Sequence, residues 1–244
     1  MSKDYHENLA DILYGITMNT IKKFREYKRI NQVDHEIQKF KQDLVFSIFG
    51  LDDERFISAR VAGGFVQSVT RRLGTLFERY VKEIVKAQLN LSEEDIKYSA
   101  RIGGHIRDLE ITIFLNKLEP KDRARIERII LKEAQNALPT KRYIGLGFEV
   151  RYAYTIGDSK RIQADEDMAI HLKNNDILPI MLVFSTVNLA SPLAHLSRYW
   201  IIKTGDETFN FLKQLTEFDL KEFLLQYKDE IRKEVGKVLN EVFR

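Results

Sequence analysis

The sequence predicts an α/β fold, with strands in the middle of the chain and helices around them. Residues 106–115 alternate between apolar and polar side chains, which is typical of a half-buried strand. Residues 70–89 place apolar side chains at the three-and-four spacing of an amphipathic helix. A further predicted strand at 145–156 is followed by a helix at 159–174 and the apolar run 177–187. That order indicates two parallel strands joined by a crossover helix.

Composition describes an ordinary globular protein and excludes several classes of site. The chain has 244 residues, of which 44% are apolar and 31% charged, enough for one core plus a helical appendage. It has no cysteine, which excludes disulfides, a thiolate zinc site and a cysteine nucleophile. The net charge of +3 permits a nucleic-acid partner without indicating one. Because neither an apolar signal core nor a membrane-length apolar run occurs, we expect a cytoplasmic protein with no membrane partner.

Residues 1–60 are predicted to be helical and to form a region of their own. Apolar side chains recur there at helical spacing in two groups. The groups consist of Leu9, Ile12, Leu13 and Ile16, and of Ile37, Phe40, Leu44, Val45 and Ile48. This region carries no catalytic pattern, and we expect it to serve dimer contact or to embrace DNA. Residues 61–244 are expected to form the domain that carries the chemistry.

The other expected elements complete the α/β pattern. They are a short strand at 96–102 that ends at a Gly-Gly turn, a charged helix at 121–137, a strand at 198–203, a helix at 207–215 and a long helix from residue 219 onward. Alternation along the strand at 145–156 puts two sets of side chains on opposite faces. One set is Phe148, Val150, Tyr152 and Tyr154, and the other is Glu149, Arg151 and Ala153.

Carboxylates on the strands at 106–115 and 145–156 indicate a metal site. Asp108 and Glu149 would supply two oxygen ligands from neighbouring strands, with the Val150 carbonyl as a further ligand. Magnesium is typically held by one or two carboxylates, with waters and substrate phosphate completing its shell. Such an ion neutralises the charge that develops when a phosphodiester is hydrolysed. Arg151, on the same face as Glu149, would hold the scissile phosphate or the attacking water.

The same residues also fit a plain alternative. Acidic residues on strands usually face solvent, and Glu149 with Arg151 would then be ordinary surface charges. Glu110, which shares a face with Asp108, favours the metal site, because two such carboxylates repel unless a cation or solvent intervenes.

Asp108, a helical excursion and then Glu149-Val150-Arg151 resemble the PD-(D/E)XK nuclease superfamily, in particular type II restriction endonucleases. The run 72–78 is similar to the helix that often precedes the core of these enzymes, and its last residue, Glu78, matches a glutamate near the metal site. The run 147–152 is similar to the family's Glu-X-Lys strand. Two further similarities are the Gly157-Asp158-Ser159 turn and the buried strand at 179–184. The likeness covers residues 70–205.

The resemblance implies a restriction-endonuclease-like core, with a central mixed β-sheet flanked by helices. It implies Mg²⁺ as cofactor, double-stranded DNA as substrate and a homodimer that cuts both strands. The implied catalytic residues are Asp108, Glu149, Arg151 and Glu78, and the implied metal ligands are Asp108, Glu149 and Val150.

Two positions depart from the family pattern. Arg107 stands before Asp108, where the family often has proline. Arg151 occupies the position of the usual lysine, and arginine keeps the charge but cannot exchange a proton. If the reaction needs a proton acceptor here, Lys160 or a phosphate of the substrate would have to serve.

Polar residues outside the motif are candidates for contacts with DNA. They are Lys160, Arg161, Gln163, Arg72 and His105. Glutamine suits adenine and arginine suits guanine, so the residues of the crossover helix would read bases. An exposed helix face carries such residues without any function, and both interpretations stay open.

Three functions follow in order of preference. The first is a type II restriction endonuclease. The second is a non-catalytic DNA-binding or structural protein on a nuclease-like fold, with Arg151 marking lost activity. The third is a helical assembly module whose α/β core is purely structural.

Overall fold

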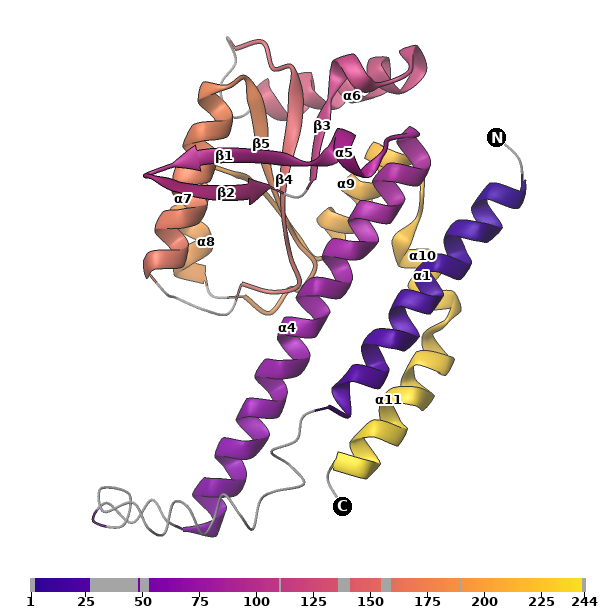
Figure 1. Ribbon diagram of the computed structural model, residues 1–244, viewed down its shortest axis with the longest axis vertical. Helices are drawn as coiled ribbons and strands as arrows, with labels where there is room; N and C mark the ends of the chain where they lie inside the picture. The colour runs from indigo at the N-terminus through magenta and orange to yellow at the C-terminus, as the bar shows by residue number, and fades with distance from the viewer. Residues whose placement is uncertain are drawn as a thin grey trace. The chain divides into compact units, whose positions relative to one another are not determined.

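The computed structural model describes residues 3–26, 48, 53–109, 111–135, 141–154, 159–188 and 190–242. Within them the chain is a mixed α/β protein (Figure 1). Its helices are α1 (Lys3–Phe24), α4 (Glu54–Leu89), α5 (Glu93–Ile96), α6 (Pro120–Gln135), α7 (Ser159–Asn174), α8 (Ala190–Leu196), α9 (Asp206–Thr216), α10 (Leu220–Gln226) and α11 (Lys228–Val242), with a 3-10 turn, η2, at Leu115–Lys117. Its strands are β1 (Tyr98–Ile102), β2 (His105–Leu109), β3 (Ile111–Phe114), β4 (Gly145–Arg151), β5 (Ile177–Val183) and β6 (Ile201–Thr204).

The chain divides into two compact units. One contains Met1–Leu9 and Phe77–Phe223, and we call it the sheet unit; the other contains Ala10–Leu76 and Leu224–Arg244, and we call it the helical unit. The expected boundary between domains at residue 60 stays a prediction. The second apolar group of the N-terminal region, from Ile37 to Val45, lies outside the described residues.

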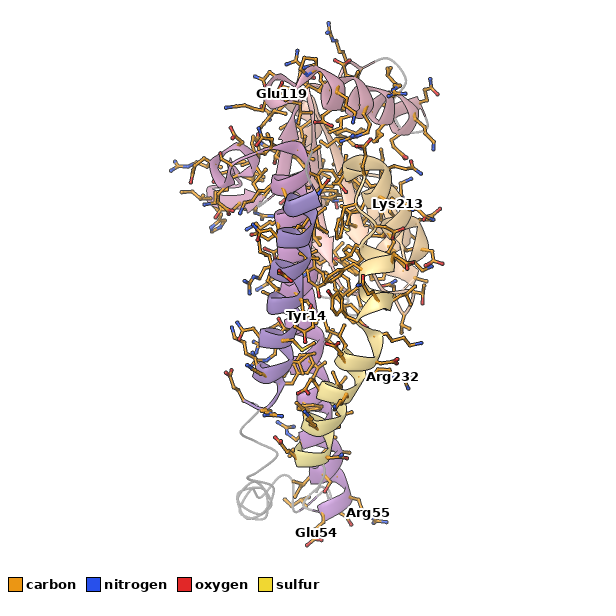
Figure 2. The ribbon with its side chains drawn as sticks, turned by 90° about the vertical axis from the view of Figure 1, so that its right-hand side faces the viewer. Tyr14, Glu54, Arg55, Glu119, Lys213 and Arg232 are labelled. Carbon is orange, nitrogen blue, oxygen red and sulfur yellow. The ribbon has the colours of Figure 1, made fainter. Side chains whose placement is uncertain are left out.

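The helical unit is built from parts of α1, α4 and α11. Ile21 and Phe24 of α1 pack with Val238 of α11, and Val69 of α4 contacts the same cluster. The side chain of Tyr14 lies against α11, where its hydroxyl donates a hydrogen bond to Glu230 at 2.9 Å (Figure 2).

A four-stranded mixed sheet forms the centre of the sheet unit, in the order β3-β4-β5-β6. β3 is antiparallel to β4, whereas β4, β5 and β6 run parallel, so the expected crossover through α7 is confirmed. β5 is buried on both faces, as its apolar run predicts. Helices α7 and α8 lie on one face of this sheet and α9 on the other (Figure 1).

The register of β4 with β5 determines which side chains of β4 face α7. Glu149 is in register with Met181, and Arg151 with Val183. Met181 and Val183 pack with α7 residues in the buried core, so Glu149 and Arg151 face the same helix. Phe148 faces the other way, and its ring lies 6.4 Å from a phenylalanine ring of α9.

The predicted single strand at 106–115 is wrong, because the chain forms two strands there that belong to different sheets. β2 pairs with β1 in an antiparallel hairpin, while β3 pairs with β4. The hairpin turns at Gly103 and Gly104, whose φ angles of 57° and 82° suit glycine in a tight two-residue turn. Leu109 and Ile111 are both buried, so the two strands keep the alternation that a single strand would have.

Two other expectations are corrected. The long helix from residue 219 is two helices, α10 and α11, that meet at Tyr227. Tyr154 does not share the face of Phe148, because β4 ends at Arg151 and the alternation of the strand ends with it. The helices at 70–89, 121–137, 159–174 and 207–215 all form, the first as the C-terminal half of α4. None of the described helices combines the length and apolar character that crossing a membrane requires.

Candidate active site

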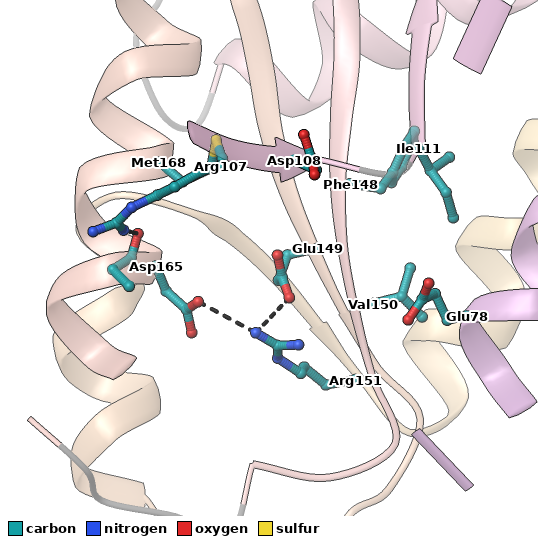
Figure 3. A pocket seen from close by; sticks show the side chains of 11 residues that line it. Glu78, Arg107, Asp108, Ile111, Phe148, Glu149, Val150, Arg151, Asp165 and Met168 are labelled. Atoms are coloured by element: carbon teal, nitrogen blue, oxygen red, sulfur yellow. Dashed lines mark hydrogen bonds and ion pairs between the residues drawn. The ribbon is translucent and has the colours of Figure 1, made fainter. Parts of the chain in front are cut away.

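The sheet unit contains a cavity of about 300 Å³ between β2, β4, α7 and the C-terminal half of α4 (Figure 3). Its charged lining residues are Glu78, Arg107, Asp108, Glu149, Arg151 and Asp165. All four residues expected to be catalytic, Glu78, Asp108, Glu149 and Arg151, are among them. The cavity therefore gathers these four side chains, which are up to 73 positions apart, from Glu78 to Arg151, into one place.

Asp108 reaches the cavity from the hairpin and not from the neighbouring strand of the main sheet, as had been expected. It is exposed, and Ser99, opposite it on β1, donates a hydrogen bond to its Oδ1 at 2.7 Å. The hairpin packs closely over β4 because Gly147 lacks a side chain. A Cβ atom there would lie 2.9 Å from the Leu109 Cδ2 atom. Glu110, the neighbouring carboxylate, lies outside the described residues.

Arg107, the residue before Asp108, holds the hairpin to α7. Its Nη1 donates to the backbone carbonyl of Ala164 at 2.8 Å, and its Nη2 lies 3.6 Å from the Asp167 carboxylate. The residue before Asp108 thus fixes the position of β2 through a side-chain contact.

Arg151 lies between two carboxylates on the α7 side of the sheet. Its Nη2 is 2.5 Å from Glu149 Oε1 and 3.3 Å from Asp165 Oδ1, and Figure 3 shows the guanidinium between them. The Glu149 and Arg151 side chains are only 18% and 25% exposed, which argues against ordinary surface charges. The Arg151 Nε is buried and, within the described parts of the chain, lacks a hydrogen-bond partner.

Asp165 is a site residue that the sequence interpretation did not include. It is 6% exposed, and the Tyr154 hydroxyl donates to its Oδ2 at 3.0 Å. Its backbone carbonyl accepts a hydrogen bond from Trp200 Nε1 at 2.8 Å. A signal for it exists in the sequence, because Asp165 falls on the apolar stripe of α7 with Met168 and Leu172, where a carboxylate needs a buried partner.

Burial and neighbouring charges shift the pKa values of both Glu149 and Arg151 upward. Burial raises the pKa of the Glu149 carboxyl, and the charges of Arg151 and Arg161 lower it by less than burial and Asp165 raise it. Burial alone lowers the pKa of Arg151, but the charges of Glu149 and Asp165 outweigh burial and raise that pKa above its usual value. Arg151 therefore stays a cation, and burial keeps the pKa of Glu149 above its ordinary value despite this neighbour.

The Val150 carbonyl points to the edge of β4 on which β3 lies. The Arg151 carbonyl accepts a hydrogen bond from the amide of Phe184, just after β5. Successive carbonyls of a strand point to opposite edges, so the Val150 carbonyl points toward β3. Among the described residues, the last pair of β3 with β4 is Ile111 opposite Phe148, two positions before Val150.

Glu78 comes to the cavity from α4, next to a well-packed aromatic residue. The preceding Phe77 ring stacks on Phe184 with centroids 4.3 Å apart and on Tyr152 at 5.9 Å. This packing ties the helix to the ends of β4 and β5 and so fixes the position of Glu78.

The donor atoms at the cavity fit a hard divalent cation. The acidic side chains and the Val150 carbonyl offer only oxygen, which magnesium prefers. Among the described residues, no three acidic or histidine side chains form a ready-made metal cluster. One or two carboxylates are enough for magnesium, and a cation beside Glu149 would favour the charged form that burial disfavours.

The five candidates for DNA contacts lie outside the cavity lining. Lys160 and Gln163 are exposed on α7, where the Gln163 amide donates to Asp167 at 2.9 Å. Arg161 is half-buried and close enough for its charge to act on Glu149, and His105 is exposed at the start of β2. Arg72 belongs to the helical unit, where its Nη2 donates to Glu26 at 3.3 Å.

Comparison with protein-family models, with curated proteins and with solved structures finds no match to this chain.

Proposed function

We propose that the chain is a magnesium-dependent type II restriction endonuclease of the PD-(D/E)XK superfamily, which hydrolyses phosphodiester bonds of double-stranded DNA at specific sites. One observation supports this most strongly. A single cavity is lined by Glu78, Asp108, Glu149 and Arg151, the four residues that the resemblance assigns to the catalytic centre. They come from α4, β2 and β4, with the crossover helix α7 and the parallel strand β5 beside them.

In this proposal the acidic residues and the arginine have separate tasks. Asp108, Glu149 and the Val150 carbonyl would hold Mg²⁺, which when bound supplies positive charge to the phosphate and lowers the pKa of the attacking water. Arg151 holds a phosphate oxygen or orients the water. Because its pKa is raised, Arg151 does not accept the proton of the water. That proton passes to another group, for which Lys160 or a neighbouring phosphate of DNA is the candidate.

Sequence recognition and assembly complete the proposal. Lys160, Gln163 and Arg161 on α7, with His105 on β2, contact DNA near the cavity, and Arg72 contributes from the helical unit. A symmetric homodimer places one cavity at each strand, as cutting both strands of a palindromic site requires.

The alternative is a non-catalytic DNA-binding or structural protein on a nuclease-like fold. It is favoured by the contact of 2.5 Å between Arg151 and Glu149, because a guanidinium there competes with a cation for the carboxylate. In this alternative the site binds the DNA backbone without hydrolysing it.

Incubation of the protein with phage DNA, in magnesium and in a chelator, separates these functions. The proposal predicts discrete fragments in magnesium only. Asp108→Ala and Glu149→Ala abolish them, whereas Glu94→Ala, which removes an 86% exposed carboxylate on α5, leaves the pattern unchanged. Retarded but intact DNA supports the alternative. If the DNA is neither cut nor retarded, both functions are excluded and an assembly module is favoured. Full cleavage by both cavity variants contradicts the site assignment.

A further inference from the structure

Asp165 makes a contact that the proposed chemistry does not explain. It is a nearly buried carboxylate at the cavity, and it shares the Arg151 Nη2 with Glu149. Glu149 is the nearer partner, at 2.5 Å, and Asp165 is the more distant one, at 3.3 Å. Charge-assisted N–H···O contacts are usually about 2.7–2.9 Å long, so the contact with Asp165 has room to shorten.

A cation bound to Glu149 changes this balance. The carboxylate then shares its negative charge with the cation, and its attraction for Arg151 weakens. The cation also repels the guanidinium directly. Unless a second negative charge attracts it, Arg151 leaves the cavity, and the positive group that the reaction needs is lost.

Asp165 is suited to be this second charge because the fold holds it in place. The Tyr154 hydroxyl donates to its Oδ2, which leaves Oδ1 for Arg151. The Tyr154 amide in turn donates to the Asn188 side chain at 2.7 Å. The backbone of Asp165 is also held, because its carbonyl accepts a hydrogen bond from Trp200 Nε1. Because both its side chain and its backbone are held, Asp165 cannot follow Arg151 toward solvent.

We propose that Asp165 is a positioning residue, which keeps the Arg151 guanidinium at the cavity when Glu149 binds a divalent cation. The inference rests on the proposed function, because it needs a cation at Glu149. It gives the two acidic partners of Arg151 different roles: Glu149 exchanges the guanidinium for the cation, and Asp165 retains it.

Titration calorimetry of the full chain with Mg²⁺, in the absence of DNA, tests the inference. The proteins are the wild type, Asp165→Asn, Arg151→Gln and the double variant. Asp165→Asn is expected to weaken Mg²⁺ binding by about 10- to 100-fold, because Arg151 then has only Glu149 as a partner and competes with the cation. In the Arg151→Gln background the same change has at most about a threefold effect, since no guanidinium remains to be held.

Glu166→Gln is the matched control, because it removes a negative charge from the same helix at a residue that contacts His195 instead. It is expected to change Mg²⁺ binding by less than about threefold. Equal effects of Asp165→Asn in both backgrounds overturn the inference, since Asp165 then acts on the cation or on the fold without Arg151. No effect in either background also overturns it. A wild type that binds no Mg²⁺ overturns the proposed function and the inference together.

A second measurement needs no Asp165 variant and covers the case in which Asp165→Asn does not fold. In wild-type protein labelled at arginine Nε, the resonance of Arg151 is assigned by its absence from Arg151→Gln. The inference predicts that this N–H stays protected from solvent exchange when Mg²⁺ saturates the protein. Loss of protection on adding Mg²⁺ shows that Arg151 is released, and contradicts the inference.

Discussion

Glu149 is held away from water, beside one guanidinium and one further carboxylate, in a setting that favours its neutral form. An acid whose pKa is raised by folding binds its proton more tightly in the native state than in the unfolded state. The stabilisation by this proton is complete below the ordinary pKa of glutamate and is lost as the pH rises through the raised value. A cation beside the ionised carboxylate would offset this loss, which links the pH dependence of stability to metal binding.

We therefore predict that Glu149→Gln unfolds at a higher temperature than the wild type at neutral pH in the absence of metal. The difference narrows as the pH falls toward the ordinary pKa of glutamate, because the wild-type carboxyl then carries a proton as well. Thermal unfolding of both proteins at a series of pH values measures this. An advantage for the variant that grows at low pH contradicts the raised pKa.

For Arg151 the prediction separates binding from cleavage. Arg151→Gln retains Mg²⁺ binding, or binds it more tightly, because the competitor for Glu149 is gone. Its cleavage rate falls by about 100- to 1000-fold, the usual loss when one group that stabilises transition-state charge is removed. Calorimetry and single-turnover cleavage measure the two effects, and Arg151→Lys, which keeps the charge, is expected to restore part of the rate. Loss of Mg²⁺ binding in Arg151→Gln would show that the arginine supports the metal site instead.

At the residue scale, the sequence predicted the members of the cavity better than their surroundings. Asp108, Glu149 and Arg151 follow from alternation along strands and from the resemblance, and all three line the cavity. Asp165 was not predicted to belong to the site. Its role depends on Tyr154, which approaches α7 only because β4 ends at Arg151 and the chain bends there.

At the scale of elements, the hairpin determines where Asp108 lies. Helix α7 and strands β4 and β5 were predictable because each combines a clear period with a length typical of its type. The division of residues 106–115 between β2 and β3 was not predictable from the sequence. Two consecutive strands in different sheets keep the same alternation of apolar and polar residues as one strand. The break between α10 and α11 at Tyr227 was not predictable either, because apolar residues keep helical spacing across it.

Gly147 gives a test of the hairpin's position. In Gly147→Ala the new methyl group meets the Leu109, Leu172 and Ile177 side chains at 2.9–3.1 Å. Overpacking of this kind destabilises by about 1–3 kcal/mol, and here it also pushes β2, with Asp108, away from β4. Chemical denaturation measures the stability, and Mg²⁺ titration of the variant measures the site. Weaker Mg²⁺ binding than in the wild type is expected, and unchanged binding would show that Asp108 does not depend on this contact.

At the scale of the whole molecule, the candidate site and the helical core belong to different units. The residues of the cavity all belong to the sheet unit, while parts of α1, α4 and α11 form a separate helical core. We proposed from sequence that the N-terminal helices serve dimerisation or DNA binding, and the proposal of a homodimer predicts a mass twice that of the 28.6 kDa chain. Light scattering at several protein concentrations measures it. A monomer mass at every concentration, with and without DNA, contradicts the proposed assembly.

The central claim, that Asp108 and Glu149 form a magnesium-dependent nuclease site, is tested most directly by sequencing the ends of phage DNA after incubation with Mg²⁺. For the wild type we predict ends that share one short palindromic sequence, and no new ends in a chelator. For Asp108→Ala and Glu149→Ala, each shown to fold by its thermal unfolding, we predict none. Ends of the same sequence from either variant, or intact DNA with the folded wild type in Mg²⁺, would contradict the claim.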